Sequence, residues 1–262
     1  MQQTIDFVAE SEALDAILDG LVGEGWDTVT QFKGWTINDV LVHLHFWNGM
    51  VDLALRDPGG FAREAGDITA AISASGFRAT ENARVTERGP ALRDVWRARY
   101  LEIGAGWAGL DPKARVQWVG PDMSVRSAMT ARQMETWAHG QEVFDILGQQ
   151  RQEQDRIRNI VMLGVNTFGW SFQVHGRKVP PTLPQLHLTA PSGALWRFGE
   201  DAANTISGAA VEFAQVVAQT RNIADTGLAV AGPVATEWMA IAQCFAGGPE
   251  TPPMPGQRHR QV

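Results

Sequence analysis

Hydrophobic positions in the first 150 residues recur at the three- and four-residue spacing of amphipathic helices. The segment from Thr36 to Asp39 resembles a capping box in which Asp replaces the usual Glu, so a helix is expected to begin there. Residues 111–126 contain two prolines and are expected to form a connection. The pattern predicts helices over residues 7–22, 36–56, 61–74 with some residues beyond 74, 90–107 and 127–148.

The pattern changes after residue 150. Residues 154–175 again predict a helix, whereas residues 184–198 alternate and break at a Pro-Ser-Gly turn, which is typical of a β-hairpin. A helix over 207–219 and a short strand followed by a helix within 228–246 complete the pattern. We therefore predict an α+β protein: a helical bundle over residues 1–150, a smaller α+β domain over 151–247, and a loose tail over 248–262.

Composition and charge exclude several classes of function. The net charge of −7 and the absence of a basic block argue against nucleic-acid binding. The chain contains no run of eighteen apolar residues, so no membrane-spanning helix is predicted. The acidic N-terminal segment lacks the features of a signal peptide. A cytoplasmic location is the simplest expectation. Cys244 is the only cysteine, which excludes an intramolecular disulfide and a Cys-based metal knuckle.

Three residues could bind a metal ion together. Glu135 and His139 are four residues apart on one predicted helix, so both side chains lie on the same face and can reach one ion at about 2.0–2.2 Å. His43 lies in the middle of the helix that begins at Thr36. If the two helices are neighbours, three ligands converge and leave positions open for water or substrate. That layout is typical of a catalytic metal site.

The same residues allow plainer interpretations. A Glu and a His four apart are common as a solvated pair, and a single histidine within a helix is more often a hydrogen-bonded core residue. His45 competes with His43, because it points to nearly the opposite face of the helix. Asp39 and Glu142 could orient the histidine rings by hydrogen bonds, or could simply be surface charges.

Two segments carry a resemblance to a known family. Residues 34–44, Gly-Trp-Thr-Ile-Asn-Asp-Val-Leu-Val-His-Leu, resemble the W-[ST]-x-x-D-[VL]-x-x-H-L opening of the DinB-like superfamily, and more narrowly of the mycothiol-dependent maleylpyruvate isomerase group. Residues 135–148 resemble that group's E-x-x-x-H-[GA]-x-D-[LV] helix, with Glu142 where the group usually has Asp. The resemblance covers roughly residues 8–148. The C-terminal part is a weaker match, similar to sterol-carrier-like domains.

The resemblance implies a four-helix bundle with one divalent ion held by His43, Glu135 and His139. The ion is commonly zinc, although nickel, iron or manganese suits the same ligands. Members use it to activate water or a low-molecular-weight thiol, with mycothiol the usual thiol of the group and glutathione an alternative. Their activities include isomerisation of maleylpyruvate and thiol transfer to electrophiles.

We therefore predict a metal-dependent and thiol-dependent isomerase or thiol transferase that acts on a small unsaturated or electrophilic acid. A metal-dependent hydrolase and a binding protein with a structural metal are the alternatives. Arg126, Arg132 and Arg221 could each hold a carboxylate of the substrate or cofactor by a two-pronged contact, or could be solvated residues near helix ends. The resemblance favours Arg221, because members often carry an arginine at this point.

Overall fold

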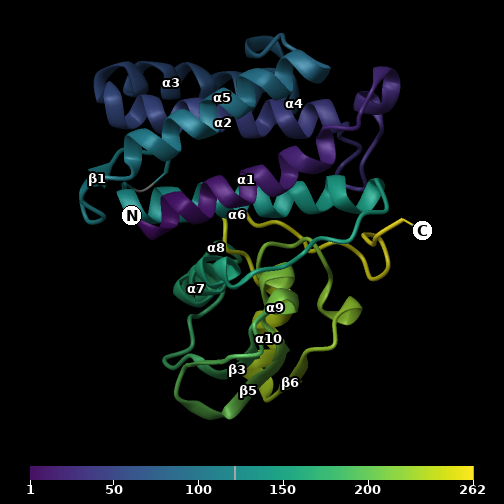
Figure 1. The fold of residues 1–262 in the computed structure, drawn as a ribbon. Helices are drawn as coiled ribbons and strands as arrows, with labels where there is room; N and C mark the ends of the chain where they lie inside the picture. The colour runs from purple at the N-terminus through teal and green to yellow at the C-terminus, as the bar shows by residue number, and fades with distance from the viewer. Residues whose placement is uncertain (121, 262) are drawn as a thin grey trace. The chain divides into compact units, whose positions relative to one another are not determined.

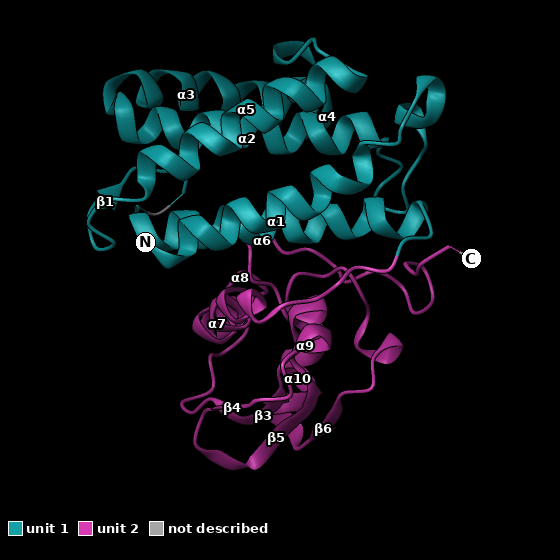
Figure 2. Ribbon diagram, in the orientation of Figure 1, with its two compact units in different colours: residues 1–149 teal, residues 150–262 magenta. Residues whose placement is uncertain are grey.

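The computed structural model describes residues 1–120 and 122–261. The chain divides into two compact units, Met1–Gln149 and Gln150–Val262, here called unit 1 and unit 2 (Figure 2). Unit 1 is built mainly from helices, and unit 2 combines a β-sheet with helices (Figure 1). The fold class is therefore α+β, as the sequence predicts.

A four-helix bundle forms the centre of unit 1. Helix α1 contacts α5 and α6, and α2 contacts the same two helices, which closes the bundle. Helices α3 and α4 pack against α2. A pair of antiparallel strands, each two residues long, precedes the last helix of the unit. The elements are α1 (Gln2–Leu18), a 3₁₀ turn (Gly23–Asp27), α2 (Ile37–Arg56), α3 (Pro58–Ser75), α4 (Phe77–Arg84), α5 (Gly89–Trp107), β1 (Arg115–Val116), β2 (Met123–Ser124) and α6 (Val125–Ile146).

The start of α2 shows how local sequence fixes this architecture. The Thr36 side chain accepts a hydrogen bond from the Asp39 backbone N–H at 3.1 Å, and the Asp39 carboxylate accepts one from the Thr36 backbone N–H at 2.9 Å. This is the predicted capping box. The helix then runs to Arg56 and buries an almost continuous apolar face, with Leu41 and Leu44 fully enclosed.

Helix α4 is separate from α3, whereas the sequence pattern suggested one continuing helix. Gly76 ends α3 with a φ of 80°, a backbone conformation that glycine adopts without strain. The chain changes direction there, and α4 contacts α2. This break places Glu81, near the middle of α4, against the inner face of the bundle, where its side chain is buried.

Unit 2 contains a four-stranded sheet in the order β4-β3-β5-β6. Strands β3 and β5 pair in parallel, and the other neighbours pair antiparallel. Alternate residues of β3 are buried, Leu186 and Leu188 among them, so one face of the sheet supplies the core. The elements are a 3₁₀ turn (Asp155–Ile157), α7 (Arg158–Asn166), α8 (Phe168–Val174), β3 (Pro184–Thr189), β4 (Leu195–Phe198), β5 (Asp201–Ala209), α9 (Ala210–Val217), a 3₁₀ turn (Ile223–Asp225), β6 (Ala229–Ala231) and α10 (Pro233–Ile241).

Two expectations for this half of the chain need correction. Residues 154–175 form two helices and a 3₁₀ turn: α7 ends before Thr167, whose backbone leaves the helical conformation with a φ of −97° and a ψ of 14°. Strand β5 was not predicted, since its small and polar residues show little apolar alternation. The loose tail over residues 248–262 stays a prediction: residues 248–261 contain no helix or strand, and the Asn222 amide donates to the carbonyl of Pro253 at 2.8 Å.

Gly164 allows α7 and α9 to approach closely. A Cβ atom on this residue would lie 2.8 Å from Val217 Cγ2 and 3.1 Å from Phe213 Cε1, and both neighbours are buried. We expect Gly164→Ala to lower the free energy of unfolding by about 1–3 kcal/mol in urea denaturation, although alanine is the better helix former. Gly169→Ala in α8 is the control, because its Cβ would meet Val179 at an ordinary 3.5 Å. Equal stability of the two variants would contradict this packing.

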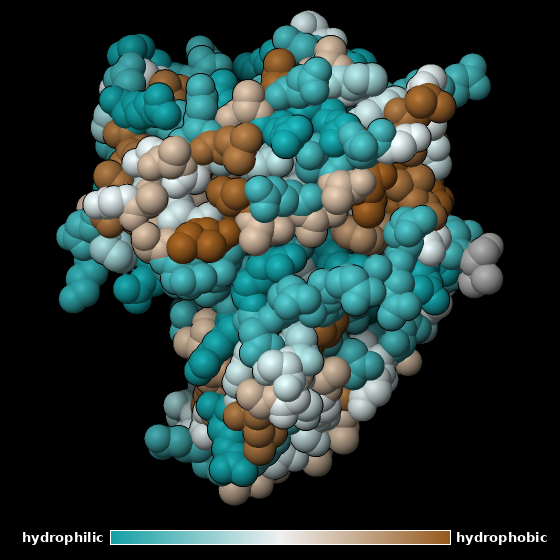
Figure 3. Space-filling model, viewed as in Figure 1, coloured by the Kyte–Doolittle hydropathy of each residue, from teal (hydrophilic) through white to brown (hydrophobic). Residues whose placement is uncertain are grey.

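On the face drawn in Figure 3, hydrophobic side chains are interspersed with hydrophilic ones. No helix of the described residues is both long and apolar enough to cross a membrane.

Candidate metal centre

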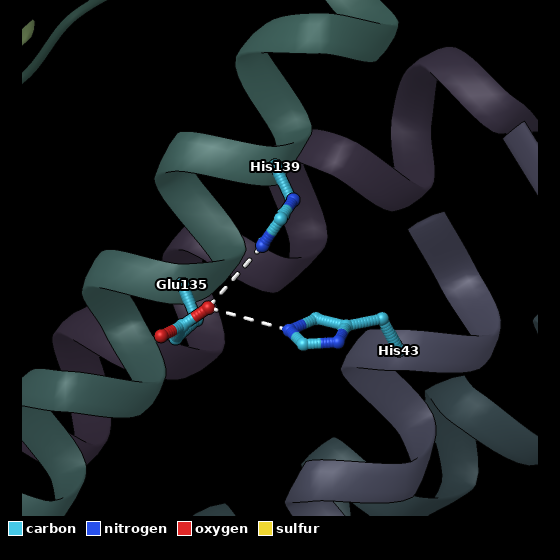
Figure 4. A group of neighbouring side chains, drawn as sticks. All are labelled: His43, Glu135 and His139. Carbon is cyan, nitrogen blue, oxygen red and sulfur yellow. Dashed lines mark hydrogen bonds and ion pairs between the residues drawn. The ribbon is translucent and has the colours of Figure 1, made fainter. Parts of the chain in front are cut away.

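His43, Glu135 and His139 meet inside unit 1. His43 extends from α2, and Glu135 and His139 extend from successive turns of α6 toward it (Figure 4). One ligand atom from each residue lies within 4.8 Å of the other two. The structure therefore brings together the three residues that the sequence analysis selected.

Their separations suit a single bound ion. Glu135 Oε2 lies 3.4 Å from His43 Nε2 and 3.3 Å from His139 Nε2. Two atoms bonded to one tetrahedral ion at about 2.0–2.1 Å stand about 3.3–3.4 Å apart. Two imidazole nitrogens and one carboxylate oxygen are also a donor set found in catalytic zinc sites. The residues present thus fit a divalent ion in both geometry and chemistry.

Glu81 fixes the orientation of the His43 ring. Its Oε1 accepts a hydrogen bond from Trp47 Nε1 at 2.6 Å and lies 2.9 Å from His43 Nδ1. A carboxylate can only accept, so His43 Nδ1 carries the proton and donates it. His43 Nε2 is then the nitrogen that faces Glu135 and the candidate ion. With 1% of its surface exposed, Glu81 is held in this arrangement by burial.

The sequence offers Asp39 and Glu142, but not Glu81, as side chains that could orient the histidine rings. Asp39 does not orient His43: its carboxylate instead caps α2 and accepts a hydrogen bond from Asn82 at 2.8 Å. The contact expected from Glu142, which is buried on α6, stays a prediction. No sequence motif marks Glu81, because its contact with His43 spans 38 residues and depends on how α4 packs.

Aromatic rings enclose the two histidines. Trp35 stacks on His139 with ring centroids 5.7 Å apart and an interplanar angle of 3°. Phe32 meets the same imidazole edge-on at 5.0 Å. Both rings come from the loop before α2, which the hydrogen bond from the Thr30 hydroxyl to the Trp35 carbonyl closes at 2.8 Å. This loop covers the histidines with apolar surface and restricts the positions of their rings.

The electrostatics of the metal-free protein follow from burial and from these contacts. Burial by itself would lower the pKa of His43, but Glu81 and Glu135 outweigh it and raise this pKa to about 9. Burial would raise the pKa of Glu135, yet its hydrogen bonds with His139 and His43 hold the pKa well below its ordinary value. Burial and the positive charge of His43 lower the pKa of His139. Without a bound ion, His43 is therefore protonated near neutral pH, and it lies between Glu81 and Glu135.

His45 lies outside this group. It is half-buried, and burial together with the charge of Arg99 lowers its pKa. The three candidate arginines also differ. Arg126 is exposed at the start of α6, whereas Arg132 is buried one turn before Glu135. Arg221 belongs to unit 2, where its Nη1 donates to the carbonyl of Thr220 at 2.8 Å, and its role stays a prediction.

Comparison with known proteins agrees with this architecture. The sequence model of the family described as "Mycothiol maleylpyruvate isomerase N-terminal domain" matches residues 7–144, which is more than half of the chain. The chain belongs to this family. The matched span contains all of His43, Glu81, Glu135 and His139, and it lies within unit 1.

Relatives extend the comparison to most of the chain. Uncharacterized proteins from two strains of Mycobacterium tuberculosis are each 39% identical over 251 residues, covering 93% of this chain and 95% of the relative. The crystal structure of the mycothiol-dependent maleylpyruvate isomerase is similar with a TM-score of 0.52 at 14% identity, over 82% of this chain and 87% of that one. A mutant of that enzyme gives a TM-score of 0.51 at 15% identity over the same shares. At such low identity these structures establish the fold.

Proposed function

We propose that this protein is a metal-dependent and thiol-dependent enzyme, an isomerase or thiol transferase, that acts on a small unsaturated or electrophilic acid. The observation that carries the proposal is the meeting of three ligand atoms from His43, Glu135 and His139, at separations that suit one divalent ion. Zinc is the leading choice for two imidazoles and a carboxylate, although nickel, iron and manganese accept the same donors.

A divalent ion held by these residues would supply the positive charge that keeps a small thiol deprotonated at neutral pH. The residues of the chain perform the remaining tasks. Glu81 keeps the His43 Nε2 lone pair directed into the site, and Trp35 and Phe32 limit the access of water to the histidines. Three protein ligands leave at least one further position for an external molecule.

The reacting sulfur would come from outside the chain. Cys244, the only cysteine, is buried in unit 2. The solved neighbours are named for mycothiol and maleylpyruvate, which supports a low-molecular-weight thiol and a small unsaturated acid here. Mycothiol is the first thiol to test and glutathione the second. In an isomerisation, the thiolate would add to one alkene carbon, the resulting single bond would rotate, and loss of the same thiolate would restore the double bond.

The proposal is tested by incubating the zinc-loaded protein with maleylpyruvate in the presence and absence of mycothiol or glutathione. Turnover that needs both the metal and the thiol is the expected result. Turnover that proceeds equally without thiol would point to a hydrolase. A protein that holds stoichiometric metal but turns over nothing with any thiol would point to a binding protein with a structural ion.

We expect the apparent affinity for Zn²⁺ to rise about tenfold per pH unit between about pH 6.5 and 8.5. The reason is that His43, with a pKa of about 9 in the metal-free protein, must release a proton before its Nε2 can bind the ion. Protons therefore compete with the metal below this pKa, and the competition weakens as the pH rises. Competition with a chromophoric chelator at several pH values measures the slope, and an affinity that does not change over this window would contradict the predicted proton release.

A further inference from the structure

Arg132 is a buried cation beside the candidate metal centre. It lies three residues before Glu135 and seven before His139, so these side chains share one stripe of α6. Only 3% of its surface is exposed, and its Nε and Nη2 atoms are buried without a hydrogen-bond partner. Burial lowers the pKa of Arg132, while the negative charges of Glu135 and Glu81 oppose that effect.

A bound anion would stabilise this buried guanidinium. A buried guanidinium that leaves N–H groups unpaired is unfavourable, because it loses its hydration without a replacement. Once a divalent ion is bound and His43 is neutral, the ion and Arg132 together bring three positive charges. Glu81 and Glu135 bring two negative charges, so one positive charge is in excess among the ion, Arg132 and these two carboxylates.

We propose that Arg132 binds a carboxylate of the small molecule that occupies the metal centre. This inference rests on the proposed function and adds a specificity-determining contact to it. Nε and Nη2 lie on one edge of the guanidinium, and their two N–H groups match the two oxygens of a carboxylate. A backbone carbonyl has only one oxygen and cannot make this paired contact. Burial strengthens the contact, since little water competes for it. Arg126, six residues earlier on the same helix, is exposed and lacks this burial.

The test uses the full-length, zinc-loaded protein with maleate as the probe and its neutral dimethyl ester as the matched ligand. Arg132→Met removes the charge at similar length, Arg132→Lys keeps the charge but loses the two-pronged edge, and Arg126→Met is the control. We expect Arg132→Met to weaken maleate binding about 10- to 100-fold in calorimetric titration, and Arg132→Lys to fall between Arg132→Met and wild type. Binding of the ester and the zinc content should not change.

A second pair of probes identifies which molecule carries the carboxylate. N-acetylcysteine and N-acetylcysteamine are similar thiols, and only the first has a carboxylate. If wild type prefers N-acetylcysteine and Arg132→Met loses this preference while maleate binding stays, the carboxylate belongs to the thiol; the opposite pattern assigns it to the substrate. Either pattern supports the role of Arg132.

The proposal is overturned if wild type binds neither carboxylate probe better than its neutral partner, or if Arg132→Met and Arg132→Lys bind both carboxylates as wild type does. If these variants keep stoichiometric zinc, the metal centre stands and only the role of Arg132 fails. A wild-type protein that cannot be loaded with zinc overturns the proposed function and, with it, this site. Should Arg132→Met not fold, Arg132→Lys decides.

Discussion

His43→Ala is expected to lose most of its bound metal, whereas His45→Ala is expected to keep it. His43 supplies one of three ligand atoms, which lies 3.4 Å from Glu135 Oε2. Structural zinc sites bind with about 10–16 kcal/mol over four ligands, so the loss of one ligand should weaken binding by roughly two to three powers of ten. His45 is the matched control on the same helix, because it lies outside the group of three ligand residues.

The measurement is elemental analysis of the purified and zinc-reconstituted variants, together with circular dichroism to confirm the helical fold. His43→Ala also removes a hydrogen-bond donor from the buried Glu81, so a loss of stability would complicate the result. His139→Gln addresses this point, since it removes a ligand and leaves the pair of His43 and Glu81 intact. If His45→Ala loses the metal and both other variants retain it, the assignment of ligands is wrong.

The sequence predicts the helices of unit 1 because their signals are local. The capping box at Thr36 sets the start of α2, and the spacing of Glu135 and His139 places both on one face of α6. The convergence of His43 with this pair depends on contact between α2 and α6, which periodicity alone does not predict. The resemblance to the family supplied that step, and the structure shows the distances.

The sequence does not predict the features that depend on long-range packing. Glu81 lies on α4, whose separation from α3 depends on the single turn at Gly76, and nothing near it in the chain marks it as a partner of His43. Arg132 was one of three candidate arginines, and only its burial distinguishes it from Arg126. In unit 2, β5 is a central strand made mostly of small and polar residues, so its pairing with β3 and β6 could not be read from hydrophobic alternation.

Glu81 has a larger expected effect on the metal than any other residue that does not bind it. A carboxylate that accepts the proton of a ligating imidazole fixes the ring and makes the ligand more basic, and its removal typically costs 10- to 100-fold in metal affinity. In this protein the same carboxylate, together with Glu135, also raises the pKa of His43 to about 9 in the absence of metal, so it favours the binding of both the ion and the competing proton.

The effect of Glu81 on zinc binding and its effect on proton binding at His43 depend differently on pH. Measuring zinc affinity at several pH values therefore distinguishes a positioning role of Glu81 from a merely structural one. In Glu81→Gln the amide oxygen can still accept from Trp47 and His43, which preserves the packing, but the negative charge is lost. The pKa of His43 should then fall, so protons compete less near neutral pH. Zinc affinity of the variant should be about 10-fold below wild type or lower at about pH 8.5, and the deficit should shrink toward about pH 6.5. Competition with the chromophoric chelator measures how zinc affinity depends on pH in wild type and in the variant.

Equal affinities with the same pH dependence would show that Glu81 only fills space beneath His43. A variant that regains wild-type affinity at high pH would show that the charge of Glu81 does not act on the bound ion.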